Sequence, residues 1–511
     1  MRTSALVSST ALVVALATST RAQEPRTDPG LEPLGHKHLV DAHAALPRDA
    51  LGGLDAPAWD AVAAFRAPTF PIVKRTVLGY LPYWSYTSGN PYVPARWDLL
   101  TILAWFAAEM DGSGNITNKH GWGGATTAAI VQDAHAHGVE VIVTITNFNS
   151  TQIASIVGSA ANRQRAIDSC LGLMEEHGAD GINIDFEFVP ASAKANFVTF
   201  MSELKDAVVA AQPNGKDGHV SLAGPAVDWS GAYDYDQLLI HTDGIMIMAY
   251  GYHWSGGDPG PIATLFSGNL WGTHSIEWTI ADYFEYGGIE NRGHVILGLP
   301  WYGNAWRVAN RDVPGDALAN GTTVTYKAAM PQFASNGREW EPVSKSSYYH
   351  RTVDGNLQQV WVDDGEAFQA RVAYADQMDI GGIGIWALGY EGTHPDLWDA
   401  IHDELAVTAE PSVEPGPEVV EVAPEPSAEP ALEPPPEPGP EPVAEPVADA
   451  STTVPPVEPD ASGGPGATAL DPLRRVQADV VEDAGGCAGG PVSGLWLALA
   501  AIVWGVRRRE R

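Results

Sequence analysis

Eight short apolar runs, rich in Val, Ile and aromatic residues, alternate with longer amphipathic segments between about residues 72 and 406. Segments such as ATTAAIVQDAHAHG and AKANFVTFMSELKDAVVAAQ have helical periodicity, so the alternation predicts repeated βαβ units and a parallel sheet. Eight such units in roughly 335 residues fit a closed (β/α)8 barrel better than an open doubly wound sheet. Neither a GxGxxG nor a GxxxxGKS/T loop follows an early run, which disfavours nucleotide-binding folds. The runs are TVLGYLPYW, LLTILAWF, VEVIVTITNF, DGINIDFEF, HVSLAGPAV, DGIMIMAY, HVILGLPWYG and IGGIGIWAL.

The alternation breaks once, between LGLPWYG and GIGIWAL, where about 75 residues replace a single loop and helix. Within this stretch, Asp354-Gly355 separates two β-prone runs and predicts a hairpin turn. We therefore expect a small β-rich insertion after strand 7, at about 307–365, lying at the barrel mouth.

The fourth run, DGINIDFEF, combines apolar alternation with Asp180, Asn183, Asp185 and Glu187. Side chains alternate faces along a strand, so Asn183, Asp185 and Glu187 share one face and the bulky apolar residues share the other. The outer helices would cover the apolar face, which directs the polar residues into the barrel. Glu187 then lies at the carboxyl end of the strand, where barrel enzymes carry catalytic groups. Burying acids costs on the order of several kcal/mol unless they are hydrogen-bonded, so this row is either a packing network or a functional site.

The pattern resembles the D-G-x-x-x-D-x-E signature of glycoside hydrolase family 18, the chitinase-like barrels, through Asp180, Gly181, Asp185 and Glu187. The resemblance spans about residues 76–400, and GYLPYW, MAY, LGLPWYG and GGIGIW follow in the order of the family's first, sixth, seventh and eighth strands. It implies a (β/α)8 barrel that cleaves β-1,4 bonds next to N-acetylglucosamine without a cofactor. The type would be a chitinase or an N-acetylglucosaminidase.

The resemblance also implies a substrate-assisted retaining mechanism, in which the 2-acetamido oxygen of the sugar attacks the anomeric carbon. Glu187 would be the general acid and then the base. Asp185 would orient the acetamido group, and Asp180 would support Asp185 electrostatically. Tyr250 would hydrogen-bond the acetamido oxygen, and Trp386 would form the apolar floor of the cleavage site.

Further substrate-binding residues follow by position. Tyr80 and Tyr302 are expected to contact the sugar or to pack beside it. Asn183 stands where the family often has Asp; an amide can hydrogen-bond Asp185 but cannot share a proton with it. Gly251 stands where the family often has an acid.

The chain ends predict export and attachment. Residues 1–22 have the basic start, apolar run and small residues of a signal peptide, and residues 23–71 form an extension without a readable function. The catalytic barrel at 72–406 precedes a disordered Pro/Glu-rich linker at 407–486. A Cys, a short apolar run and an Arg cluster at 487–511 resemble a bacterial surface-sorting tag, or form a plain membrane anchor. We expect a protein that is secreted, or held at the cell envelope or surface.

The net charge disfavours nucleic acids as partners, and the distribution of histidines disfavours a metal site. The formal net charge is −34, and residues 410–483 alone carry 17 Asp or Glu against two Arg. Such acidity disfavours a nucleic-acid partner. The 15 histidines show no HExxH pattern, so no metal site is expected, and the two cysteines do not predict a disulfide.

The expected partner is an aminosugar polysaccharide, either chitin or peptidoglycan, bound by a monomer. Two alternatives remain: a chitinase-like protein that binds glycans with weak or no turnover, and a surface scaffold. Barrels serve binding as well as catalysis, so the fold alone does not decide.

Overall fold

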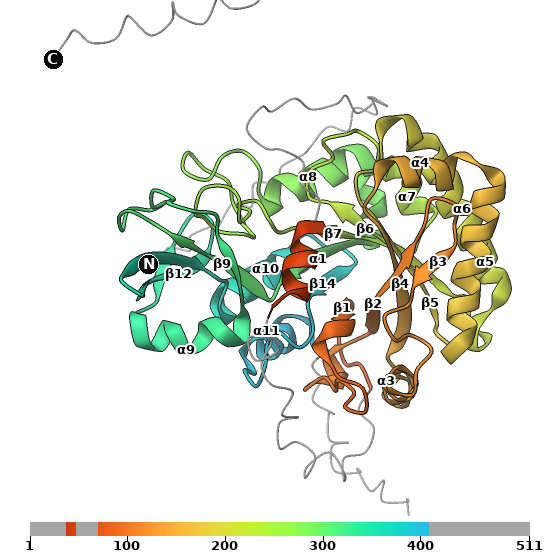
Figure 1. The fold of residues 1–511 in the computed structure, drawn as a ribbon, viewed down its shortest axis with the longest axis horizontal. Coiled ribbons are helices and arrows are strands. Elements are labelled where there is room, and N and C mark those ends of the chain that lie inside the picture. Colours follow the sequence, from red (N-terminus) through yellow and green to blue (C-terminus); the bar gives the residue numbers. More distant parts are fainter. Residues whose placement is uncertain (1–36, 47–69, 408–511) are drawn as a thin grey trace, which may run out of the picture. The chain divides into compact units, whose positions relative to one another are not determined.

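The computed structural model describes residues 37–46 and 70–407. Its main sheet closes on itself, because β1 pairs in parallel with both β2 and β14. Around the barrel the order is β1-β14-β8-β7-β6-β5-β4-β2, and β3 (Ile116–Asn118) adds to β2 in the antiparallel sense. The expected (β/α)8 barrel is confirmed (Figure 1). Its strands are β1 (Thr76–Pro82), β2 (Ile102–Met110), β4 (Glu140–Asn147), β5 (Gly181–Phe186), β6 (His219–Pro225), β7 (Gly244–Met248), β8 (Val295–Pro300) and β14 (Gly382–Trp386).

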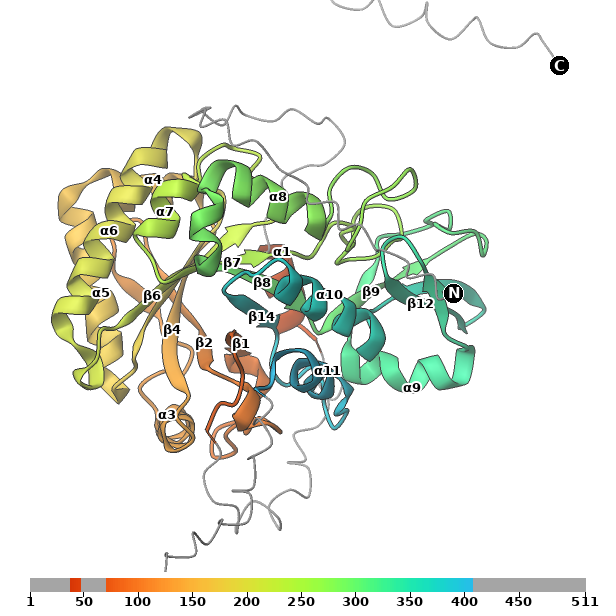
Figure 2. The same cartoon turned by 180° about the vertical axis from the view of Figure 1, so that it is seen from behind.

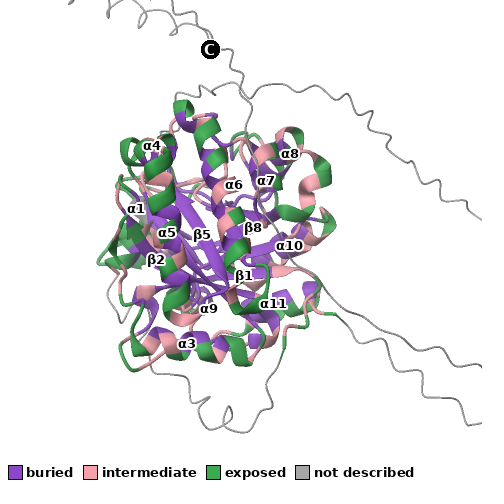
Figure 3. Cartoon of the chain, turned by 90° about the vertical axis from the view of Figure 1, so that its right-hand side faces the viewer, coloured by how far each residue is buried: buried purple, intermediate pink, exposed green. Residues whose placement is uncertain are grey.

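Helices cover the outside of the barrel, with exposed residues on their outer faces and buried strands within (Figure 3). Local sequence fixes several helix starts: the side chains of Asn149, Ser159 and Asp364 each accept a hydrogen bond from a backbone N–H in the first turn. Figure 2 shows the same ring from behind. The helices are α3 (Ala125–Ala136), α4 (Ser150–Gly158), α5 (Ala160–His177), α6 (Lys194–Ala211), α7 (Tyr235–Ile240), α8 (Ile276–Gly287), α10 (Gly365–Gln377) and α11 (Asp396–Leu405).

The packing of α6 on β5 orients the strand that carries the acids. Phe186 of β5 stacks against Phe197 and Phe200 of α6, with ring centroids 6.5 and 5.8 Å apart. Because neighbouring strand residues point to opposite faces, Phe186 on the outside places Asp185 on the inside. The alternation predicted from the sequence is therefore the alternation observed.

The insertion after β8 is a five-stranded antiparallel sheet in the order β10-β9-β13-β12-β11. It begins at Tyr302, a few residues earlier than expected, because β9 starts almost directly after the barrel strand. Asp354 and Gly355 have φ values of 48° and 76°, and they connect β12 to β13 in the expected hairpin. The elements are β9 (Tyr302–Arg307), β10 (Thr322–Thr325), α9 (Tyr326–Asn336), β11 (Glu339–Glu341), β12 (Ser346–Val353) and β13 (Asn356–Trp361).

Several sequence predictions fall on residues outside the described part of the chain. These are the signal peptide, most of the 23–71 extension, the acidic linker and the C-terminal segment. The described part of the extension forms α1 (Lys37–Ala44), a helix that the sequence had not indicated. Among the described helices, none combines the length and the hydropathy needed to cross a bilayer. Cys170 is buried as a free thiol.

Candidate active site

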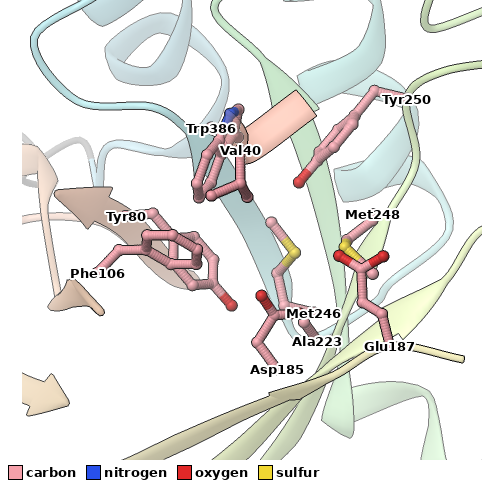
Figure 4. Close-up of a pocket in the computed structure, with 10 residues that line it drawn as sticks. All are labelled: Val40, Tyr80, Phe106, Asp185, Glu187, Ala223, Met246, Met248, Tyr250 and Trp386. Atoms are coloured by element: carbon pink, nitrogen blue, oxygen red, sulfur yellow. The ribbon is translucent and has the colours of Figure 1, made fainter. Parts of the chain in front are cut away.

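A pocket opens at the carboxyl ends of the barrel strands, and the acids of the β5 segment lie at its base. Asp185 is the fifth residue of β5, and Glu187 follows the strand directly. Figure 4 shows the carboxyl groups of both residues pointing into the same space, with Trp386 on its far side. The pocket has an empty volume of about 330 Å³, and its lining residues are Val40, Tyr80, Phe106, Asp185, Glu187, Ala223, Met246, Met248, Tyr250 and Trp386.

Backbone hydrogen bonds hold the end of β5 in place. The Glu187 N–H donates to the carbonyl oxygen of Asn147 at 3.1 Å, which continues the β4–β5 ladder beyond the strand. The hydroxyl of Tyr233 donates to the carbonyl oxygen of Phe186 at 2.7 Å. Glu187 is therefore on an anchored backbone although it lies outside the strand, and its side chain is only 3% exposed.

A short polar chain fills the barrel below the acids. The Tyr80 hydroxyl donates to Asn183 Oδ1 at 3.0 Å, and Asn183 Nδ2 donates to the hydroxyl oxygen of Ser221 at 3.0 Å. Asn183 is fully buried, so these partners satisfy groups that would otherwise be costly to bury. Tyr80 lines the pocket, whereas Asn183 does not, so the amide acts by holding Tyr80.

Two acids, Asp185 and Glu187, lie in the pocket beside tyrosines that stay uncharged. Burial, and second the charge of Glu187, raise the pKa of Asp185 well above its ordinary value. Burial also raises the pKa of Tyr80 and of Tyr250 well above the usual range of a phenol. Both tyrosines therefore keep their hydroxyl protons. Oδ1 of Asp185 has no hydrogen-bond partner among the described protein groups.

Trp386 forms one wall of the pocket at the end of β14, as expected. Its ring packs edge-on against Phe106, with centroids 4.7 Å apart, and it tilts against Tyr80 at 5.8 Å. Tyr302 is buried 6.1 Å from Tyr250, ring centroid to centroid, and does not line the pocket. Of the two tyrosines predicted by position, only Tyr80 reaches the pocket.

The structure places Asp180 outside the pocket. Burial and the charge of Glu187, not Asp180, shift the pKa of Asp185, so the expected electrostatic support from Asp180 is not seen. Asp180 precedes β5 at the opposite end of the barrel, where Oδ2 accepts from the Val141 N–H at 2.8 Å and lies 2.7 Å from His135 Nε2. Oδ1 accepts from Asn214 at 2.7 Å. Asp180 thus joins the start of β4, through Val141, to the last turn of α3, through His135, and to the turn before β6, through Asn214.

Sequence reasoning missed some lining residues that the same rule could have found. Met246 and Met248 are two residues apart in β7, so both side chains point into the barrel. Asn183 and Asp185 have the same spacing in β5. Phe106 lies in the middle of β2, level with Pro82 at the end of β1. In contrast, nothing in the sequence indicated Val40, because it belongs to α1, far from the barrel in the chain.

Within residues 37–46 and 70–407, no group of three or more His, Cys, Asp or Glu side chains is placed to hold a metal ion. The arrangement can perform acid–base chemistry on a neutral ligand: one acid beside a second acid of raised pKa, hydroxyl donors, and an apolar aromatic wall.

The barrel region of the chain matches a known family and several characterised proteins. The model of the glycosyl hydrolases family 18 matches residues 76–391, more than half of the chain. A class V chitinase of Arabidopsis thaliana is 26% identical over 279 residues, covering 49% of this chain and 70% of the plant protein. The cortical fragment-lytic enzyme of Bacillus anthracis is 21% identical over 318 residues, covering 60% of this chain and 69% of the bacterial protein.

A solved structure supports the fold in the same way. The chitinase-like agglutinin of Robinia pseudoacacia superposes with a TM-score of 0.57 at 20% identity, over 64% of this chain and 98% of the agglutinin. This likeness concerns the fold only. The family match, which includes β1 through β14 and therefore every strand of the barrel, shows that the chain belongs to the glycosyl hydrolases family 18.

Proposed function

We propose that this protein hydrolyses β-1,4 bonds next to N-acetylglucosamine in chitin or peptidoglycan, by a substrate-assisted retaining mechanism. The observation that carries the proposal is the pairing of Asp185 and Glu187 in one pocket with Tyr250 and Trp386. A sugar ring on the Trp386 wall would present its glycosidic oxygen and its 2-acetamido group to these side chains.

Glu187 is the proton donor in this proposal. Its proton passes to the glycosidic oxygen as the bond to the anomeric carbon breaks, and the leaving sugar departs as an alcohol. Glu187, now a carboxylate, then removes a proton from the water that attacks the anomeric carbon and restores the starting state. General acid–base catalysis of this kind contributes about 10²–10⁴-fold to a rate.

The nucleophile in this proposal comes from the substrate. Asp185 and Glu187 are the two carboxyl groups that line the pocket, and the raised pKa of Asp185 keeps it protonated and weakly nucleophilic. The acetamido oxygen would instead attack the anomeric carbon and form an oxazolinium ion. Asp185 would accept a hydrogen bond from the acetamido N–H through its carbonyl oxygen and so orient the group, while the Tyr250 hydroxyl would donate to the acetamido oxygen.

The substrate class and the cellular site belong to the same proposal. One relative is named a chitinase and another a cortical fragment-lytic enzyme, which supports an aminosugar polymer without choosing between chitin and peptidoglycan. We further propose that the protein acts as a monomer and is secreted or attached to the cell surface through its C-terminal segment. Analysis of the products released from chitin and from peptidoglycan shows which of the two polymers is the substrate.

The experiment compares nitrophenol release from a 4-nitrophenyl chitooligosaccharide by the wild-type chain and by Glu187→Gln. We expect Glu187→Gln to lower kcat/KM by about 100-fold or more, because the amide cannot donate the required proton. Glu175→Gln is the matched control, since Glu175 is exposed on helix α5. It should leave the rate unchanged.

The contrary result would be equal, negligible release by both proteins while each still binds the oligosaccharide. That result would make this chain a glycan-binding protein on a hydrolase fold. Failure to bind any aminosugar polymer would indicate a scaffold.

A further inference from the structure

Helix α1 lies across the mouth of the barrel, over the pocket that contains the acids (Figure 1). Three residues on one side of this segment, Val40, His43 and Leu46, are spaced as neighbours on a helical face and pack against the core. Val40 lines the pocket itself and lies opposite the two acids in Figure 4. The residues between them on the other side, including Asp41 and Ala44, are exposed.

His43 makes the deepest contact of the helix. It is fully buried, and its Nδ1 accepts a hydrogen bond from the indole N–H of Trp386 at 3.1 Å. Its ring lies 6.3 Å from that of Trp386 with the planes 28° apart, 4.6 Å from Tyr302 and 5.4 Å from Tyr390, centroid to centroid. A residue from the N-terminal extension thus occupies an aromatic cage made by the barrel and the insertion.

The contacts of α1 are those that a bound sugar would need. Trp386 is the wall on which the sugar ring would lie, yet its indole is engaged by His43 and only 5% of Trp386 is exposed. Val40 of α1 occupies part of the space in front of the acids, since it is itself one of the residues that line the pocket. Cleavage inside a polymer needs sugar units on both sides of the bond, so the polymer and α1 exclude one another.

We propose that α1 is an autoinhibitory segment that occupies the sugar site, so that the protein binds its polymer only after α1 has left. This inference rests on the proposed function. The barrel does not need α1, because its closure depends on β1, β2 and β14, and α1 contributes no strand. An eight-residue helix is not stable alone in water, so α1 should lose its helical structure when it leaves.

Two substitutions in the full chain test the proposal. Val40→Asp places a charge on the buried face of α1, and Ala44→Asp places the same charge on its exposed face. We expect Val40→Asp to raise kcat/KM on a 4-nitrophenyl chitooligosaccharide by about tenfold or more, because it increases the fraction of open molecules, and Ala44→Asp to match the wild type. Equal kcat/KM for all three folded proteins would overturn the proposal.

Hydrogen exchange followed by mass spectrometry separates this proposal from the proposed function, since it needs no substrate. Amides of residues 37–46 should be protected in the wild type and in Ala44→Asp and should exchange rapidly in Val40→Asp. Rapid exchange of the amides of residues 37–46 in the wild type would overturn the proposal that α1 occupies the site, whatever the substrate is. A released α1 without aminosugar binding or hydrolysis would overturn the proposed function and, with it, the inhibitory role.

Discussion

At the scale of single residues, Asp185 is held in a state that favours chemistry over stability. Its side chain is buried beside Glu187, and both conditions disfavour a charged carboxylate. In the unfolded chain the same carboxyl would ionise at about pH 4. Because the folded pKa is the higher one, folded molecules bind the proton more tightly, and this group makes folding less favourable as the pH rises above that value.

Asp185→Asn is therefore expected to raise the thermal unfolding midpoint at pH 7 while it lowers activity. Asn has nearly the same shape as the neutral carboxyl but does not ionise in the unfolded chain. The free energy needed to protonate Asp185 on folding at pH 7 therefore disappears. The gain should shrink as the pH falls through about 4 and vanish below it, where Asp185 of the wild type is protonated in both states. Calorimetric scans of both proteins across this range make the comparison. A lower midpoint for Asp185→Asn at pH 7 would contradict the raised pKa.

At the scale of elements, the two ends of β5 carry acids with opposite behaviour. Burial disfavours the charged form of Asp180, but hydrogen bonds from His135, Val141 and Asn214 outweigh it, and the pKa of Asp180 is lowered. Asp180 therefore stabilises the fold above the unfolded pKa of about 4, and this stabilisation is lost as the pH falls through the folded value.

Asp180→Ala should lower the free energy of unfolding by about 2–4 kcal/mol at pH 7, since buried donors lose a charged acceptor. Its kcat/KM below the unfolding transition should fall far less than that of Asp185→Ala. Urea titrations give the first quantity and the chromogenic assay the second, with the exposed Asp168→Ala as control. A stable Asp180→Ala protein with activity as low as Asp185→Ala would restore the electrostatic support of Asp185 that the family resemblance implies.

The same strand shows what sequence reasoning can reach. Alternation has a period of two along any strand, so the inward direction of Asn183 and Asp185 followed from the pattern alone. The position of Asp180 did not follow, because a signature names residues without saying which end of the barrel each one occupies. The sequence left two placements open for Tyr302, and the structure shows the packed one, because the strand of Tyr302 belongs to the insertion.

At the scale of the whole molecule, Arg371 of α10 connects the insertion to the barrel. It is fully buried; its Nε lies 2.9 Å from Asp363 Oδ2, and its guanidinium donates to the carbonyl oxygens of Ala263 and Lys345. Burial outweighs the charge of Arg371 and raises the pKa of Asp363 to about 6. One side chain thus joins a barrel loop, a barrel helix and the antiparallel sheet.

Arg371→Met should cost about 3–5 kcal/mol of stability, because it leaves the Asp363 carboxyl buried without its cation. Adding Asp363→Asn should recover part of this loss, since the remaining charge is removed. Urea unfolding at pH 7 measures both, with the exposed Arg311→Met as control. A double variant less stable than Arg371→Met alone would show that the ion pair is not the source of the effect.

Contacts between distant parts of the chain limit sequence reasoning most. His43 contacts Trp386 across 343 positions, and among residues 40–46, whose side chains the structure describes, three face the barrel in an Ala-rich stretch. A pattern of three residues is too short to distinguish a helix that packs on the barrel from a helix that is exposed to solvent. The barrel, in contrast, repeats its pattern eight times, and each repeat strengthens the same prediction.

The most direct test of the account is the dependence of the rate on the 2-acetamido group. Nitrophenol release from 4-nitrophenyl N,N′-diacetylchitobioside is compared with release from 4-nitrophenyl cellobioside, which carries hydroxyls at these positions. Both are measured with the wild type and with Val40→Asp. The account predicts a kcat/KM larger by about 1,000-fold or more for the acetamido substrate, because only that substrate brings its own nucleophile. Comparable rates on the two substrates would show that a protein group attacks the anomeric carbon, and would contradict the account.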